Sequence, residues 1–444
     1  MLNRRQFLER TLKGSSLIAL SGLVPQFLAN TARSAEVGKD TILVVVELNG
    51  GNDGLNTVIP YADDLYYKYR PTLAYRKEQL LRVDDHIGLH PSLRGFDQLL
   101  NNGQLAIVQG VGYPNPNRSH FESMDIWQTG DPRGKLTNGW LGRSMGSVKV
   151  PQGEIVGMHV GAEQLPLALQ GSATGTPTIN PAKPYELILD GQRINVNDVK
   201  FDQPVTVPPS PPVDVPEKPL PPAPANDKHR AERLRLIREM AELTTGSKND
   251  VLQFVSRSSL QTYTAVERLR QLLRDNQIIT NPGQAQLYSD LNLVARIIRA
   301  GFGTRIFYVA TDGYDTHSNQ RPDHERLLAN LSNAIQQFFA QLQGFGDDKR
   351  VVVMTFSEFG RRVQENGSKG TDHGSGSCLF VAGPAVQGGP IGKHPSLNDL
   401  DSGDLRYHTD FRQVYATLLD RWLGCNSQEV LGGKFDHLPL FKGA

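Results

Sequence analysis

The sequence has very little cysteine, with only Cys378 and Cys425 among 444 residues. Two thiols are too few for a disulfide framework or for a zinc site made of cysteines. A single bridge between them is possible in an oxidising compartment, and two buried thiols are the simpler interpretation.

An excess of charge and long apolar runs are also missing. The 47 Lys and Arg residues almost equal the 46 Asp and Glu residues, which gives a formal net charge of +1. Such a chain has no overall field to attract nucleic acid or an anionic membrane. No segment of the mature chain approaches the roughly 20 apolar residues that span a bilayer. We therefore expect no nucleic-acid partner and no membrane span in the mature chain.

The N-terminus has the parts of a secretory signal in their usual order. Arg4 and Arg5 precede a short apolar stretch over 15–28, and small residues follow it. The paired arginines are typical of the twin-arginine pathway. We predict a signal peptide over 1–35 and export by the twin-arginine translocase to the periplasm or the cell surface. An amphipathic helix of the mature protein is the alternative.

Nearly continuous apolar runs predict strands that are buried on both faces of a sheet. They lie at Thr41–Leu48, Leu105–Gln109, Thr304–Ala310 and Arg350–Phe356, with a shorter one at Leu379–Val381. Helical patterns lie between and after them at Leu93–Asn101, Asp323–Leu342 and Asp410–Leu423. This alternation predicts an α/β fold, an open, mostly parallel sheet with helices on both faces.

The middle of the chain has a different composition. Residues 204–224 carry ten of the 28 prolines, which is typical of a polyproline-like linker. We predict a Pro-rich irregular insertion at about 151–226, whose part over 151–203 is irregular or a small β insertion, followed by a charged helical stretch over 227–276. The mature residues 36–444 are otherwise expected to form a single domain.

Polar residues with metal-binding or nucleophilic chemistry follow four of the predicted strands. The carboxyl ends of parallel strands share one edge of the sheet, where ligands bind. The candidates are Asp53, Ser119, Asp315, His317, Glu358, Arg361, Asp372 and His373. Carboxylate and imidazole groups suit zinc, manganese or magnesium, with zinc favoured as the share of histidine rises. The pattern predicts a divalent metal site of one or two ions.

An anionic group fits the same edge. Ser119 opens a predicted helix, and the start of a helix favours phosphate or sulfate. Arg118, Arg361 or Arg362 can add bidentate contacts to such a group.

Each candidate also has a structural interpretation. Asp53 can cap its turn, and Ser119 can be an ordinary helix cap. His120 can pack or bond locally, and Glu358 with Arg361 can form a buried ion pair.

Four stretches together resemble a known family. They are Leu48-Asn-Gly-Gly-Asn-Asp-Gly-Leu-Asn-Thr, Arg118-Ser-His-Phe-Glu-Ser-Met-Asp-Ile-Trp-Gln-Thr-Gly, Tyr314-Asp-Thr-His-Ser-Asn-Gln and Ser357-Glu-Phe-Gly-Arg. The chain resembles domain-of-unknown-function family 1501 over nearly all of its mature length. That family is placed in the alkaline-phosphatase-like superfamily with sulfatases and phosphodiesterases, so the resemblance implies an alkaline-phosphatase-like fold.

The resemblance also implies roles for individual residues. Asp53 matches the metal-binding acid after the first strand, and Ser119 matches the nucleophile at a helix start. Asp315 and His317 match an acid and a histidine of one metal site, with Asp312 as an alternative to Asp315.

The superfamily has Asp-His-Gly after its fourth strand, and this chain departs from that pattern. The matching place reads Glu358-Phe359-Gly360, so a histidine is missing. His373 matches the last histidine of the superfamily. One metal site would therefore hold Asp315, His317 and His373. The second would depend on the remaining candidates, which are Asp53, Ser119, Glu358 and Asp372.

The sequence thus predicts an exported metal-dependent hydrolase of a phosphate or sulfate ester, with Ser119 as the nucleophile. The alternative is a non-catalytic exported binding protein that keeps the fold with one or no metal. The expected partner is an anionic ester substrate or an envelope polymer. His408 is a further possible ligand, and a role as a loop residue is the alternative for it.

Overall fold

The computed structural model describes residues 40–151, 154–161, 164–172, 175–181, 186–189, 192–195 and 285–443. The predicted signal peptide over 1–35, the Pro-rich stretch over 204–224 and the charged helix over 227–276 lie outside these residues. Thr41–Ala444 forms one compact unit. None of the helices in the described part is long and apolar enough to cross a membrane.

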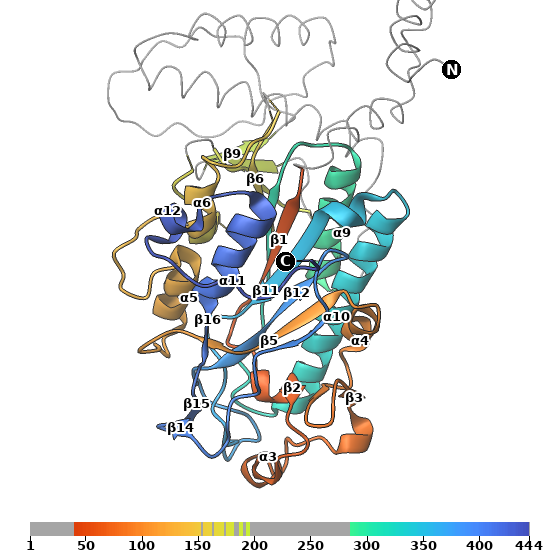
Figure 1. Ribbon diagram of the computed structural model, residues 1–444, viewed down its shortest axis with the longest axis vertical. Helices are drawn as coiled ribbons and strands as arrows, with labels where there is room; N and C mark the ends of the chain where they lie inside the picture. Colours follow the sequence, from red (N-terminus) through yellow and green to blue (C-terminus); the bar gives the residue numbers. More distant parts are fainter. Residues whose placement is uncertain are drawn as a thin grey trace, which may run out of the picture. The chain divides into compact units, whose positions relative to one another are not determined.

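An 11-stranded sheet forms the centre of this unit, in the order β13-β5-β12-β11-β1-β10-β6-β7-β8-β9, with β16 also paired to β5 (Figure 1). The bounds are β1 Ile42–Leu48, β5 Leu105–Gly112, β6 Gly157–Val160, β7 Thr178–Ile179, β8 Glu186–Leu189, β9 Gln192–Asn195, β10 Ile306–Thr311, β11 Val351–Phe356, β12 Ser377–Ala382, β13 Gly389–Ile391 and β16 Thr409–Asp410. The segment predicted to be an irregular or small β insertion contributes β6 to β9 to the sheet.

The directions of the strands bring the predicted site segments to one edge. β1 pairs in parallel with β10 and with β11. β12 is antiparallel to both β11 and β5, so β5 runs in the same direction as β11. The carboxyl ends of β1, β5, β10 and β11 consequently lie at the same edge of the sheet, as the sequence predicted.

Helices cover both faces of the sheet (Figure 1). One face packs against α4 Arg94–Asn101, α9 Gln286–Arg299 and α10 Gln320–Gln343, and the other against α5 His120–Thr129, α6 Trp140–Ser144, α11 Phe411–Leu418 and α12 Ser427–Leu431. Val44 and Val46 of β1 join the first core, and Leu43 and Val45 join the second. This alternation along a strand buried on both sides confirms the predicted fold class.

Smaller elements complete the described part. They are β2 Val58–Ile59, β3 Leu81–Arg82 and β4 Gly88–Leu89 in a three-stranded sheet, the hairpin of β14 Leu400–Asp401 and β15 Asp404–Leu405, and α3 Asp64–Tyr69. The short 3₁₀ helices are Gly54–Asn56, Lys77–Gln79, Leu167–Leu169 and Asp347–Arg350, and a π-helix at Leu419–Leu423 continues α11.

The two cysteines are free thiols. Cys378 of β12 packs against the core on the α10 side, and Cys425 packs in the core on the α11 side. Because the sheet separates the two cores, the bridge left open by the sequence is not formed.

Glu47 is a carboxyl buried inside the fold, and within the described residues no cation bonds to it. It lies on β1 with 5% of its surface exposed. Its hydrogen-bond donors are Gln128 Nε2 of α5, at 2.6 Å, and the hydroxyl of Tyr308 of β10. Both donors are neutral, and burial raises the pKa of Glu47 to about 7.

This carboxyl predicts a pH dependence of stability. A raised pKa favours the protonated folded state, so its contribution is present below the unfolded pKa, about 4.5, and is lost as the pH rises toward 7. The free energy of unfolding of Glu47→Gln minus that of the wild type should be larger at pH 8 than at pH 4, by on the order of 3 kcal/mol. Urea unfolding of the metal-free wild type and variant across this range measures the difference. A constant difference between the two proteins at all pH values would contradict a raised pKa for Glu47.

Candidate metal centre

Two glycines let the loops at the carboxyl edge of the sheet pack closely together. Gly50 and Gly51 follow β1 with φ angles of 117° and 79°, where side chains are strained. A Cβ at Gly50 would lie 2.3 Å from the Asp315 amide nitrogen, and one at Gly51 would lie 2.3 Å from the ring of Phe359. The loop after β1 therefore holds the loops after β10 and β11 in contact.

Three histidines converge on one carboxylate at this edge. The Nε2 atoms of His317 and His373 both lie 3.1 Å from Asp315 Oδ1, and His120 Nε2 lies 3.6 Å from the same oxygen. The two closer Nε2 atoms are 2.9 Å apart. Ligand atoms of His120, Asp315 and His373 all lie within 4.8 Å of one another. The structure thus joins three of the predicted metal ligands and adds His120.

The other nitrogen of each ring is held by an oxygen acceptor. These bonds join His120 Nδ1 to Glu358 Oε1 (2.8 Å), His317 Nδ1 to Asp372 Oδ1 (3.1 Å) and His373 Nδ1 to the Arg118 carbonyl oxygen (2.9 Å). Carbonyl and carboxylate oxygens accept hydrogen bonds, so each Nδ1 donates its proton. In the neutral rings every Nε2 then carries a lone pair, and the three lone pairs face the carboxylate of Asp315.

This arrangement fits a divalent cation. Lone pairs and a carboxylate at such short separations repel one another unless a proton or a metal cation lies between them. Tetrahedral zinc, with Zn–N bonds of about 2.0–2.1 Å, separates its ligand atoms by about 3.3 Å. Among His317, His373 and Asp315 the separations of 2.9, 3.1 and 3.1 Å lie close to that value, and His120 Nε2 lies 3.6 Å from Asp315 Oδ1. Metal-bound histidines also usually donate their second N–H to a carboxylate or carbonyl, as here.

Arg361 fixes the position of Asp315. It is 1% exposed, and its Nη2 lies 2.5 Å from Asp315 Oδ1. Its remaining donors bond the carbonyl oxygens of Gly50, Gly51, Tyr314 and Thr371. Burial raises the pKa of Asp315, but the hydrogen bond and charge of Arg361 outweigh it and lower the pKa overall. Arg361, which the sequence predicted to contact an anionic group, is instead placed as a positioning residue, because its side chain is fully buried.

Glu358 and Asp372, two predicted ligands, orient histidines in the structure. Glu358 is 2% exposed and accepts from the Gly50 amide (2.8 Å) and Ser357 Oγ (2.9 Å) as well as from His120. Hydrogen bonds from Asn366 and His317 lower the pKa of Asp372. Both carboxylates therefore contact the Nδ1 atom of a histidine and not its Nε2 atom.

Asp53 is not brought to the histidines. It is fully buried, and Arg70 pairs with both of its oxygens, with Nη1 at 2.5 Å from Oδ2 and Nη2 at 3.1 Å from Oδ1. Gln320 Nε2 donates to Oδ2, and the backbone N–H of Asn56 donates to Oδ1. Burial raises the pKa of Asp53, but the charge of Arg70 outweighs this effect and lowers the pKa to about 2. Asp53 thus belongs to a buried ion pair with Arg70 at the end of α3, and its bond from Gln320 ties the first loop to α10.

Ser119 lies beside the centre with a free hydroxyl. It is the half-buried N-cap of α5, directly before His120, and its side chain makes no capping bond. Within the described part of the chain, no hydrogen bond of Ser119 Oγ is found. Its backbone N–H donates to Asn117 Oδ1, and its carbonyl oxygen accepts from the Ser123 backbone N–H. The interpretation of Ser119 as an ordinary side-chain cap is not realised.

Two further candidates lie outside the group. Asp312 is exposed and accepts from Asn49 Nδ2 at 2.8 Å. His408 Nε2 contacts the Lys393 carbonyl at 2.6 Å, and its Nδ1 contacts Thr409. Asp315, not Asp312, is therefore the acid at the centre, and His408 is a loop residue.

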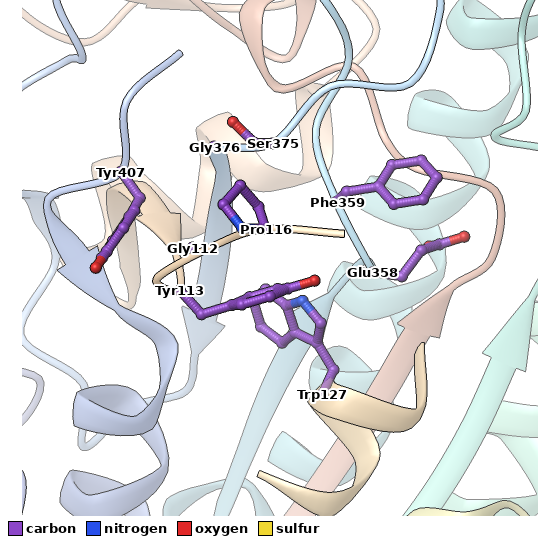
Figure 2. Close-up of a pocket in the computed structure, with 9 residues that line it drawn as sticks. All are labelled: Gly112, Tyr113, Pro116, Trp127, Glu358, Phe359, Ser375, Gly376 and Tyr407. Carbon is purple, nitrogen blue, oxygen red and sulfur yellow. The ribbon is translucent and has the colours of Figure 1, made fainter. Parts of the chain in front are cut away.

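A small pocket adjoins the centre through Glu358 (Figure 2). Figure 2 shows Glu358 and Phe359 at one end, Tyr407 at the other, and Trp127 and Tyr113 between them. Its space of about 230 Å³ includes part open to solvent. The Trp127 ring is stacked on Phe356 and Phe411.

The role of His120 was missed from the sequence, which favoured a local contact for it. One signal was available: His120 follows a predicted strand whose carboxyl end shares the edge with the other candidates. The sequence does not show which way a residue at a helix start points, and here the direction is set by Glu358, 238 positions away in the chain.

The fold and the site together define an α/β protein with a histidine-rich candidate metal centre at the carboxyl edge of its sheet. The chain belongs to the family described as protein of unknown function DUF1501, whose model matches residues 40–436. This match confirms the resemblance found in the sequence. No curated protein matches the chain significantly.

Solved structures with a similar fold include sulfatases. PsFucS1 sulfatase from Pseudoalteromonas sp. has a TM-score of 0.35 and 11% identity, covering 92% of this chain and 72% of that one. A protein solved with its substrate D-glucosamine-2-N,6-O-disulfate has a TM-score of 0.34 and 10% identity, covering 87% and 77%. A 2-O GAG sulfatase has a TM-score of 0.29 and 9% identity, covering 79% and 65%. Similarity at this level does not transfer an activity.

Proposed function

We propose that the protein is an exported hydrolase that uses one divalent ion, zinc in the first place, to cleave a phosphate or sulfate ester. The observation that carries this proposal is the convergence of three histidine lone pairs on Asp315. His120, His317, His373 and Asp315 would hold the ion. A two-ion mechanism is not proposed, because Asp53 is engaged with Arg70.

Individual residues would have different roles in such a reaction. When bound, a divalent ion would polarise an ester oxygen and lower the pKa of a hydroxyl close to it. Ser119 Oγ is the proposed nucleophile, because it has no bonded partner in the described part of the chain and adjoins His120 in sequence. Glu358 and Asp372 hold the histidine rings in the orientation that aims Nε2 at the centre.

Export remains part of the proposal. Arg4 and Arg5 with the apolar stretch behind them support the twin-arginine route. That route delivers folded proteins, so a metal centre could be complete before export.

A panel of phosphate and sulfate esters tests the proposed reaction with the zinc-loaded mature protein. We expect Ser119→Ala to lower kcat/KM by about 1,000-fold, because it removes the nucleophile. Ser318→Ala is the matched control, since Ser318 is exposed in the loop beside His317, and it should keep full activity. Full activity of Ser119→Ala would contradict its role, and inactivity of the zinc-loaded wild type against all esters would contradict the hydrolase.

A further inference from the structure

Two arginines flank the candidate metal centre. The carbonyl oxygen of Arg118 accepts from His373 Nδ1 at 2.9 Å, and the Arg362 amide donates to the Asp372 carbonyl oxygen at 2.9 Å. The backbone of each arginine is thus tied to a residue of the centre. Their side chains are 40% and 37% exposed. Both guanidinium groups therefore reach solvent next to the centre.

A buried carboxylate brings these two side chains together. Arg118 donates to Asp404 Oδ2 from Nε at 3.0 Å and from Nη2 at 2.6 Å. Arg362 Nε lies 4.0 Å from Asp404 Oδ1, and this buried oxygen has no hydrogen-bond partner. The side chain of Asp404 is only 3% exposed. The carboxylate of Asp404 is therefore shared between two guanidinium groups.

The buried arginines of the chain are used differently. Arg70 and Arg361 bond through Nε, Nη1 and Nη2 to carbonyl and carboxylate oxygens of the fold. By contrast, Arg118 Nη1 and Arg362 Nη2 have no hydrogen bond within the described residues. The planar guanidinium fork matches the oxygens of sulfate and phosphate. These spare donors therefore offer a position for an anion.

We infer that Arg118 and Arg362 bind a second anionic group of the substrate, which would then be an ester carrying more than one sulfate or phosphate. This inference rests on the proposed function, which places the reacting ester at the metal centre. The carbonyl oxygen of Arg118, and not its guanidinium, contacts the centre. The side chain extends to Asp404 instead, so the group that it binds is distinct from the one that reacts.

Binding of dextran sulfate by the zinc-loaded mature protein tests the inference, with neutral dextran as the blank and the ionic strength held constant. We expect Arg118→Gln and Arg362→Gln each to weaken binding about tenfold. Arg406→Gln is the matched control. Arg406 is 52% exposed and pairs with Asp399, and its removal changes the net charge equally. It should alter binding by less than about twofold.

The outcomes separate this inference from the proposed function. Equal losses in all three variants, or no loss in Arg118→Gln and Arg362→Gln, would overturn the inference. Binding that depends on Arg118 and Arg362 but persists in His373→Ala supports it, because that variant removes a metal ligand. If the wild type hydrolyses no ester yet binds dextran sulfate through these two arginines, the anion position is upheld and the hydrolase fails. Unfolding midpoints of all variants check that each is folded.

Discussion

Replacing His373 with alanine is expected to abolish tight zinc binding. His373 Nε2 lies within 3.1 Å of both His317 Nε2 and Asp315 Oδ1, so its removal takes away one ligand and opens the centre to water. Loss of a residue that only orients a ligand costs about 10–100-fold in affinity, and loss of a ligand itself should exceed that range. Isothermal titration of the metal-free mature protein with zinc measures the change.

His408→Ala is the matched control for this experiment. His408 is exposed and lies at the same end of β5, but its ring nitrogens contact Thr409 and a backbone carbonyl. It should bind zinc as the wild type does. Equal affinities for wild type and His373→Ala would contradict the assignment of the centre, as would an equal loss in His408→Ala.

Replacing Asp53 with asparagine should have the largest effect on folding and little effect on the metal. The carboxylate of Asp53 and the guanidinium of Arg70 are both fully buried and 2.5 Å apart. Removing one member of a buried pair leaves an uncompensated charge and costs about 3–5 kcal/mol. We expect Asp53→Asn to lose this much free energy of unfolding in urea at pH 7, while the folded variant keeps its zinc affinity.

A surface pair provides the comparison. The side chains of Arg82 and Asp85 are 64% and 81% exposed, and such pairs contribute about 0–1 kcal/mol. Asp85→Asn should therefore leave the unfolding curve almost unchanged. If Asp53→Asn were as stable as Asp85→Asn but lost zinc, Asp53 would be a ligand after all, as the resemblance to the superfamily implied.

The strands and the edge they share could be predicted from the sequence because they depend on local patterns. β1 and β11 are apolar on both faces, and such a run has few alternatives to the inside of a sheet. Once the strands are parallel, their carboxyl ends share an edge whatever the connections are. The sequence alone therefore places Asp315, His317 and His373 in the predicted group.

The division of roles within that group depends on contacts that are distant in sequence. Asp53 does not join the histidines because Arg70, at the end of α3, and Gln320 of α10 bond its carboxylate. No sequence motif marks either of these partners. Glu358 orients His120 because the loop after β11 meets the start of α5. Arg361 resembles a substrate-binding arginine in sequence, and only its burial among carbonyl oxygens shows its structural role. Spacing along the chain carries none of this information.

Metal content of the mature protein, purified after export in its host, tests the central claim most directly. Elemental analysis is expected to find one divalent ion per chain, with zinc first, and none in His373→Ala. Chelation should lower the thermal midpoint of the wild type, because the ion binds only the folded chain. Two ions per chain would contradict a single centre of three histidines and Asp315. No ion, with a midpoint that chelator leaves unchanged, would contradict the metal centre altogether and favour a non-catalytic binding protein.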